Sequence, residues 1–281
     1  MINTVRCCLA HPENQGDHDE ERAERCGSGE RGTNVGWMMG GLGIARVKQA
    51  DQQSKDEQKP MEALGEIRLS TMADLKGCRI VSEALAGSLS NEDYANYLTN
   101  VYYYARFSPV IMAAAAARCC TENEGLATYL LRHSLEEQGH EKWALADLEK
   151  LGVSGETVVR ARPTLACAAL VGYVHDLATS GNPAAIMGWM YILEAVGADI
   201  GSEVGAKLSE NRGGVLAPVQ FVAGHGAADA SHFEDINRAI EGHIQTPEDR
   251  RGVCEAARVV SYLYTTMFRQ AGNEQAGWAW S

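Results

Sequence analysis

Two short runs of histidine and acidic residues, far apart in the sequence, carry side chains that can bind a metal. The first run is Glu137-Gln-Gly-His140, and the second is His225-Gly-Ala-Ala-Asp229-Ala-Ser-His232. Residues three, four or seven positions apart lie on one face of an α-helix. Imidazole and carboxylate groups are ligands that iron, manganese and zinc accept. Two such helices facing each other therefore predict a metal site inside a helical bundle.

The second run lies among small and apolar residues, with Phe221-Val-Ala-Gly before it and Gly226-Ala-Ala within it. We expect this face to point into the protein, where an unpaired polar group costs on the order of several kcal/mol. A metal ion would supply the missing partners. The alternative is a partly exposed polar face with incidental histidines.

His133 precedes Glu137 by four residues, so it lies on the same helical face and repeats the spacing of the second run. We expect it to hydrogen-bond the ligands from behind, and a direct ligand role is the alternative. Glu136 and Glu141 point elsewhere on such a helix and are expected to be solvated.

Glu194 is the single charged residue in the apolar run from Pro183 to Ala198. A helix that is apolar on all sides is buried, and a buried carboxylate must be protonated, hydrogen-bonded or bound to a cation. The predicted ligand set then holds three carboxylates and three imidazoles, enough for two metal ions: Glu137, His140, Glu194, His225, Asp229 and His232. This mixture favours iron or manganese over calcium and magnesium, and a single zinc would leave ligands unused.

Helices must position these residues, and a helical pattern covers the chain from about residue 66. The run Ser90-Asn-Glu-Asp93 resembles a capping box, Ser108-Pro109 interrupts a helix, and Leu151-Gly152 ends one. The predicted helices cover about 94–117, 123–150, 164–180, 183–207, 216–243 and 247–271. Since no alternating strand pattern appears, the predicted class is all-α.

Residues 1–65 differ from the rest in composition, and Asn14 to Arg31 is nearly all polar. Such a segment cannot bury a core, so we expect a mostly disordered extension over 1–65 and one helical domain over 66–281. The glycine-rich patch Gly36–Ile44 lacks the Gly-Lys-Ser/Thr ending of a phosphate loop.

The composition is that of an acidic protein, with a formal net charge of −12. This balance argues against a nucleic-acid groove, which needs basic residues. No uncharged apolar run reaches the length of a membrane span, and the first residues lack a secretory pattern, so a cytoplasmic location is expected. None of the eight cysteines forms a C-x-x-C pair, so we expect free thiols.

At the predicted ligand residues the sequence resembles the heme-oxygenase-like di-iron oxidases, also called iron-containing redox enzymes. Their fold is shared with heme oxygenase, thiaminase II and pyrroloquinoline-quinone synthase. In that family a Glu is followed shortly by a ligand His, a later helix carries a lone Glu, and H-x3-D-x2-H follows. The matching positions here are those of the predicted ligand set, and Tyr102–Pro109 and Glu136–Gly152 are similar to the segments that open the fold. The resemblance covers about 66–272 and implies a heme-oxygenase-like bundle, two ferrous ions (manganese being the alternative) and a homodimer.

The resemblance also implies an oxidase or oxygenase that uses dioxygen to oxidise a small amine, amino acid or fatty acid. Tyr103 and Arg106 are candidate pocket residues, although core packing could explain the tyrosines. Arg106 could bind a substrate carboxylate or pair with an acid of the bundle. Three alternatives stay open: a thiaminase-like enzyme, which needs a reactive cysteine; heme binding through one histidine; and a non-catalytic metal-binding protein.

Overall fold

A computed structural model describes residues 39–211 and 218–274, without the side chains of a few of them, among which are 226–230. The chain divides into two units, Met1–Ala45 and Arg46–Ser281, and the second contains the predicted ligands. Every regular element in the described ranges is helical, which confirms the all-α class.

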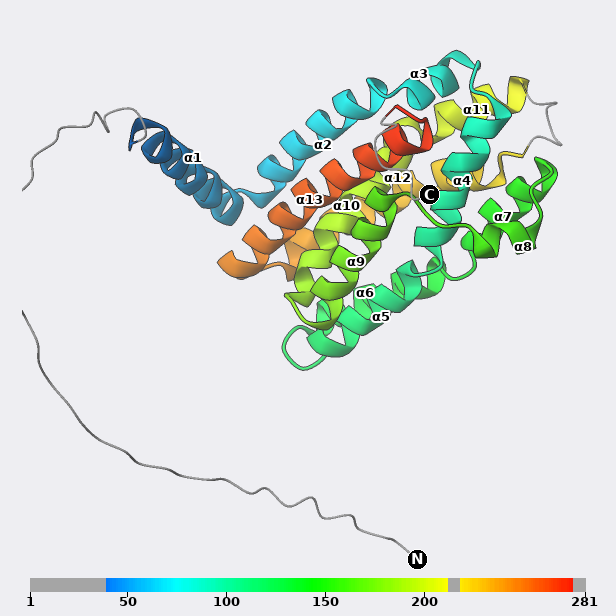
Figure 1. The fold of residues 1–281 in the computed structure, drawn as a ribbon. Helices are drawn as coiled ribbons and strands as arrows, with labels where there is room; N and C mark the ends of the chain where they lie inside the picture. The colour runs from blue at the N-terminus through cyan, green and yellow to red at the C-terminus, as the bar shows by residue number, and fades with distance from the viewer. Residues whose placement is uncertain (1–38, 212–217, 275–281) are drawn as a thin grey trace, which may run out of the picture. The chain divides into compact units, whose positions relative to one another are not determined.

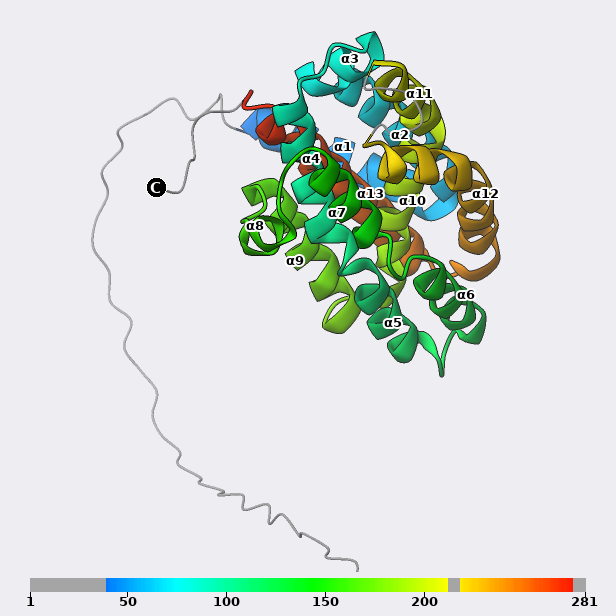
Figure 2. The same ribbon diagram turned by 90° about the vertical axis from the view of Figure 1, so that its right-hand side faces the viewer.

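The second unit is a bundle in which α10 runs through the middle, packed against α13 on one side and α12 on another (Figures 1 and 2). A 3-10 turn, η1 (Pro183–Ala185), leads into α10, and a π-helical turn, η2 (Gly197–Gly201), joins α10 to α11. The helices are α1 (Met39–Gln58), α2 (Pro60–Lys76), α3 (Arg79–Ala86), α4 (Asn91–Ala105), α5 (Ser108–Cys119), α6 (Glu124–Glu136), α7 (Glu141–Lys150), α8 (Gly155–Arg160), α9 (Leu165–Thr179), α10 (Ile186–Val196), α11 (Ser202–Asn211), α12 (Gln220–His243) and α13 (Pro247–Ala271).

Local signals in the sequence account for several helix ends. Ser90 caps α4 by accepting the backbone N–H of Asp93 at 3.0 Å, and its hydroxyl donates to the Asp93 carboxylate at 2.8 Å. The break at Ser108-Pro109 is confirmed, because α4 ends at Ala105 and α5 begins at Ser108.

The prediction of one uninterrupted helix over 123–150 is wrong. The segment forms α6 and α7, and the residues from Glu137 to His140 make the turn between them. Gly139 adopts φ +99°, a backbone conformation that only glycine reaches without strain. Glu137 and His140 therefore do not share a helical face, because one ends α6 and the other precedes α7.

The compact helical unit starts at Arg46 rather than at residue 66. Asp56 is fully buried and pairs with Arg258 of α13 at 2.6 Å, and Leu64 of α2 is fully buried as well. The disordered extension was expected over 1–65, and residues 1–38 of it lie outside the described residues.

The central helix α10 is buried over nearly its whole length. Gly188 lets it approach α13 closely, since a Cβ there would lie 2.1 Å from the Val253 carbonyl oxygen. The stretch Pro183–Glu210 is long and apolar enough to cross a membrane by composition alone, but 67% of its most apolar window is buried in the bundle. It therefore behaves as a core helix that carries Glu194 into the interior.

Candidate metal centre

The structure brings together all the predicted ligands whose side chains it describes. They come from the α6–α7 turn, from α10 and from α12. Their ligand atoms fall into two groups, and within each group all the ligand atoms lie within 4.8 Å of one another. One group, called here the turn group, consists of Glu137, His140 and His225. The other, called here the core group, consists of His133, Glu137, Glu194 and His232. Glu137 belongs to both groups.

In the turn group the Glu137 carboxylate lies between two imidazoles. Its Oε2 atom is 2.9 Å from Nδ1 of His140 and 3.9 Å from Nε2 of His225. Nδ1 of His225 lies 3.1 Å from the backbone carbonyl oxygen of Phe221. Because a carbonyl oxygen only accepts, this nitrogen is the donor, and in the neutral imidazole Nε2 is left unprotonated toward Glu137.

In the core group the buried Glu194 carboxylate faces two histidines from other helices. Its Oε1 atom is 3.2 Å from Nε2 of His133, and its Oε2 atom is 3.6 Å from Nδ1 of His232. The other ring nitrogen of His133 lies 3.6 Å from the Glu136 carboxylate. A carboxylate behind an imidazole fixes the ring orientation, an arrangement typical of metal-binding histidines.

Both central carboxylates are held in the ionised form. Burial raises the pKa of Glu137, but the neighbouring imidazoles of His140 and His225 lower it by more and leave this pKa far below the ordinary value. For Glu194, too, burial raises the pKa, and the neighbouring imidazoles of His133 and His232 lower it by more, so that the net shift is downward. The site therefore offers two carboxylate anions to a cation.

These residues fit a pair of metal ions. Oε1 of Glu137 and Oε2 of Glu194 are buried, and neither has a hydrogen-bond partner in the described part of the chain. A buried charged oxygen without a partner is costly, and a coordinated cation removes that cost. Imidazole and carboxylate ligands suit iron and manganese. Each group could hold a metal ion, and Glu137 belongs to both.

A comparison with known protein families agrees with this chemistry. The model of the family described as iron-containing redox enzyme matches residues 95–265. The chain belongs to this family. The matched range contains all six predicted ligands and His133.

Solved structures show the fold of this iron-containing redox enzyme family member. A domain of unknown function with a heme oxygenase-like fold from Shewanella denitrificans OS217 has a TM-score of 0.68 at 23% identity, over 75% of this chain and 91% of that chain. A TenA homolog from Pseudomonas syringae pv. tomato has a TM-score of 0.65 at 14% identity, over 76% and 93%. The TenA homologue from P. horikoshii OT3 has a TM-score of 0.57 at 15% identity, over 76% and 98%. The fold is heme oxygenase-like; no curated protein matches by sequence.

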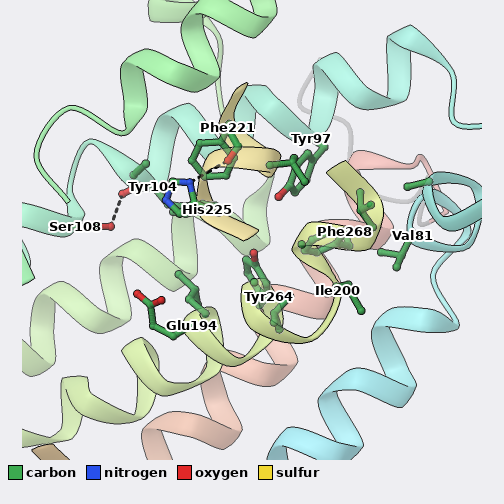
Figure 3. A pocket seen from close by; sticks show the side chains of 18 of the residues that line it. Val81, Tyr97, Tyr104, Ser108, Glu194, Ile200, Phe221, His225, Tyr264 and Phe268 are labelled. Atoms are coloured by element: carbon green, nitrogen blue, oxygen red, sulfur yellow. Dashed lines mark hydrogen bonds between the residues drawn. The ribbon is translucent and has the colours of Figure 1, made fainter. Parts of the chain in front are cut away.

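In this family member an elongated cavity reaches both ligand groups. His133, Glu137, Glu194 and His225 line one end of it. From there it extends along residues of α4, α10, α12 and α13. In Figure 3, Val81 and Phe268 lie on the side away from Glu194 and His225. Aromatic and aliphatic side chains line most of its length, and among the described residues no lysine or arginine does. The cavity therefore suits a molecule with an apolar body that places one group beside the ligands.

The predicted pocket residues Tyr103 and Arg106 do not line this cavity. The Arg106 guanidinium lies over the rings of Tyr103 and Phe107, 4.8 Å from each centroid. Tyr104 is the member of this aromatic run that reaches the cavity. Successive residues on a helix point about 100° apart, so Tyr103 and Tyr104 face different surroundings.

Three further residues complete the comparison with the sequence. Asp229 lies in α12 between His225 and His232, but its side chain is outside the described part of the structure. His133, expected mainly behind the ligands, contacts Glu194 directly and belongs to the core group. Trp143 was missed altogether, although its ring lies 4.2 Å from that of His140. Nothing in the sequence distinguishes it from a tryptophan that only packs.

Proposed function

We propose that the protein is a non-heme di-iron oxidase or oxygenase that uses dioxygen to oxidise a small organic molecule. The observation that carries the proposal is the position of Glu137. Its carboxylate belongs to both ligand groups and lines the cavity that would hold the substrate.

The turn group would hold one iron ion and the core group the other. Asp229 is proposed as a further ligand from its place in the H-x3-D-x2-H run. Two ferrous ions would supply electrons for the reduction of dioxygen, and manganese is the alternative metal. The protein holds Glu137 and Glu194 ionised and fixes the protonated nitrogen of His225 through Phe221. The apolar cavity wall excludes water from the substrate.

The cavity lining favours a substrate with an apolar body over a free amino acid. An amino acid brings an ammonium and a carboxylate group, and desolvating both costs free energy unless each is paired. The described cavity contains no lysine or arginine for the carboxylate. Its acidic side chains are those already placed in the ligand groups.

A thiaminase-like activity, the first alternative, would need a reactive cysteine at the site. None of the described cysteines lines this cavity. Burial raises the pKa of the Cys119 thiol to about 11 and those of Cys167 and Cys254 to about 12. These thiols are therefore protonated at neutral pH and poor nucleophiles.

Heme binding, the second alternative, would use a single histidine as axial ligand. The buried carboxylates of Glu137 and Glu194 would then have no role in binding the cofactor. Addition of hemin to the purified protein tests this alternative, and a Soret band that His225→Ala abolishes would favour it.

Anaerobic loading with ferrous iron tests the proposal. We expect about two irons per chain, as in other di-iron carboxylate bundles, and rapid oxygen uptake when air is admitted. His225→Ala and Glu194→Ala should each lose iron, whereas Glu149→Ala, an exposed acid of α7, should not. Iron binding without oxygen uptake would favour a non-catalytic metal-binding protein. A single zinc that Glu194→Ala leaves in place would contradict a two-metal site.

A further inference from the structure

The first turn of α12, the helix that carries His225, is capped by a side chain from another helix. Val219 stands at the N-cap position and has no polar side chain to offer. Asp147 of α7 replaces it, because its Oδ2 atom accepts the backbone N–H of Phe221 at 2.8 Å. Asp147 is fully buried. A carboxylate at this position satisfies a free N–H group and opposes the positive end of the helix dipole.

The capped residue also orients a candidate metal ligand. Phe221 accepts the Nδ1–H of His225 through its carbonyl oxygen at 3.1 Å, and its ring packs 4.1 Å from the imidazole, centroid to centroid. Asp147 therefore holds Phe221 in place, and Phe221 in turn fixes the orientation and tautomer of His225. The connection has the form of a carboxylate–histidine pair with one backbone residue between the two groups.

A second residue of α7 contacts both histidines of the turn group. The Trp143 ring lies 4.2 Å from that of His140 and 5.6 Å from that of His225. Gly224 of α12 makes room for the indole, since a Cβ at this position would lie 2.9 Å from its Cζ3 atom. Trp143 is half-buried and does not line the cavity. It therefore supports the imidazoles and takes up no space needed by a substrate.

We propose that Asp147 and Trp143 are positioning residues that set the metal affinity of the turn group. The inference rests on the proposed two-metal centre. It adds that Asp147 and Trp143 both support the turn group. Both residues belong to α7, and the hydrogen bond of Asp147 and the ring contacts of Trp143 lead to His140 and His225. None of the described hydrogen bonds or ring contacts joins either residue to His133, Glu194 or His232. The support from Asp147 and Trp143 thus reaches the turn group.

Cobalt(II) titration of the full chain, followed by its visible absorption, tests this proposal. We expect two binding steps in the wild type. Asp147→Ala should weaken one step about 10- to 100-fold, the usual effect of removing a group that orients a metal ligand, and leave the other unchanged. Asp147→Asn should restore most of the affinity, because the amide oxygen still accepts the Phe221 N–H. Trp143→Leu should weaken the same step, and Glu149→Ala should weaken neither.

Nitrogen NMR of the metal-free protein provides a readout that a purely structural role would not move. The His225 ring should keep its proton on Nδ1 in the wild type and in Asp147→Asn, and should lose this preference in Asp147→Ala. Equal weakening of both binding steps, or two unchanged steps in Asp147→Ala and Trp143→Leu, would overturn the proposal. A wild type that binds no metal would contradict the two-metal centre, and this inference with it. If Asp147→Ala does not fold, Trp143→Leu decides between the outcomes.

Discussion

Nε2 of His133 lies 3.2 Å from Oε1 of Glu194, although 61 positions separate the two residues in the chain. Neither group is more than slightly exposed, and they come from different helices, α6 and α10. The contact places an imidazole beside a buried carboxylate oxygen within the core group. It makes His133 a candidate metal ligand of the core group.

Removal of this imidazole should empty one half of the centre. We expect His133→Ala to reduce the iron content from about two ions per chain to about one, because the turn group keeps its own ligands. Metal analysis after anaerobic loading and desalting measures this. His175→Ala, an exposed histidine of α9, is the matched control and should retain both ions. Full iron content in His133→Ala would show that the residue is not a ligand.

Two glycines with positive φ allow the ligand-bearing turn to be tested against an ordinary helix end. Gly139 lies in the turn that carries Glu137 and His140, and Gly152 follows the end of α7. Gly139 and Gly152 have φ of +99° and +87°, so alanine at either position should cost about 1–2 kcal/mol of stability. We expect Gly139→Ala also to weaken metal binding, since strain there moves Glu137 and His140. Gly152→Ala should lower the melting temperature and leave the metal affinity unchanged. Unchanged metal affinity in a destabilised Gly139→Ala protein would argue against a positioned turn.

Asp93 predicts a dependence of stability on pH away from the site. Hydrogen bonds from Arg79 hold the pKa of Asp93 below its ordinary value of 3.8 against the opposing effect of burial, and the Ser90 hydroxyl adds to them. A depressed folded-state pKa contributes stability that is present above the unfolded-state value and lost as pH falls through the folded-state value. Asp93→Asn should therefore melt lower than the wild type at neutral pH, and the gap should shrink below about pH 4. A gap that stays constant down to pH 2, in thermal melts of the metal-free protein, would contradict this origin.

The sequence predicts the helices because their ends carry local signals. Ser90 and Pro109 act within a few residues, so their effects follow from neighbours in the chain. The break at Glu137–His140 was missed because a regular helix brings the same two side chains onto one face. In the folded chain the turn at Gly139 brings them together by another route.

The rest of the centre depends on packing between helices. Tyr103 and Tyr104 are the same residue type at neighbouring positions, so the sequence does not tell which of them faces the cavity. In the folded chain Tyr104 lines it and Tyr103 does not. The contacts of Asp147 with Phe221 and of Trp143 with His225 depend on how α7 lies against α12. No periodic pattern in one segment encodes such a contact.

Glu137 provides the most direct test of the two-metal centre. Its carboxylate is the one described group that belongs to both ligand sets. Anaerobic ferrous titration should give about two ions per chain in the wild type and about one in Glu194→Gln. Glu137→Gln should weaken the binding of both ions, whereas Glu149→Gln, at an exposed acid of α7, should leave both bound. Retention of both ions in Glu137→Gln, or loss of a single ion with the other bound at wild-type affinity, would contradict a centre in which two metals share this carboxylate.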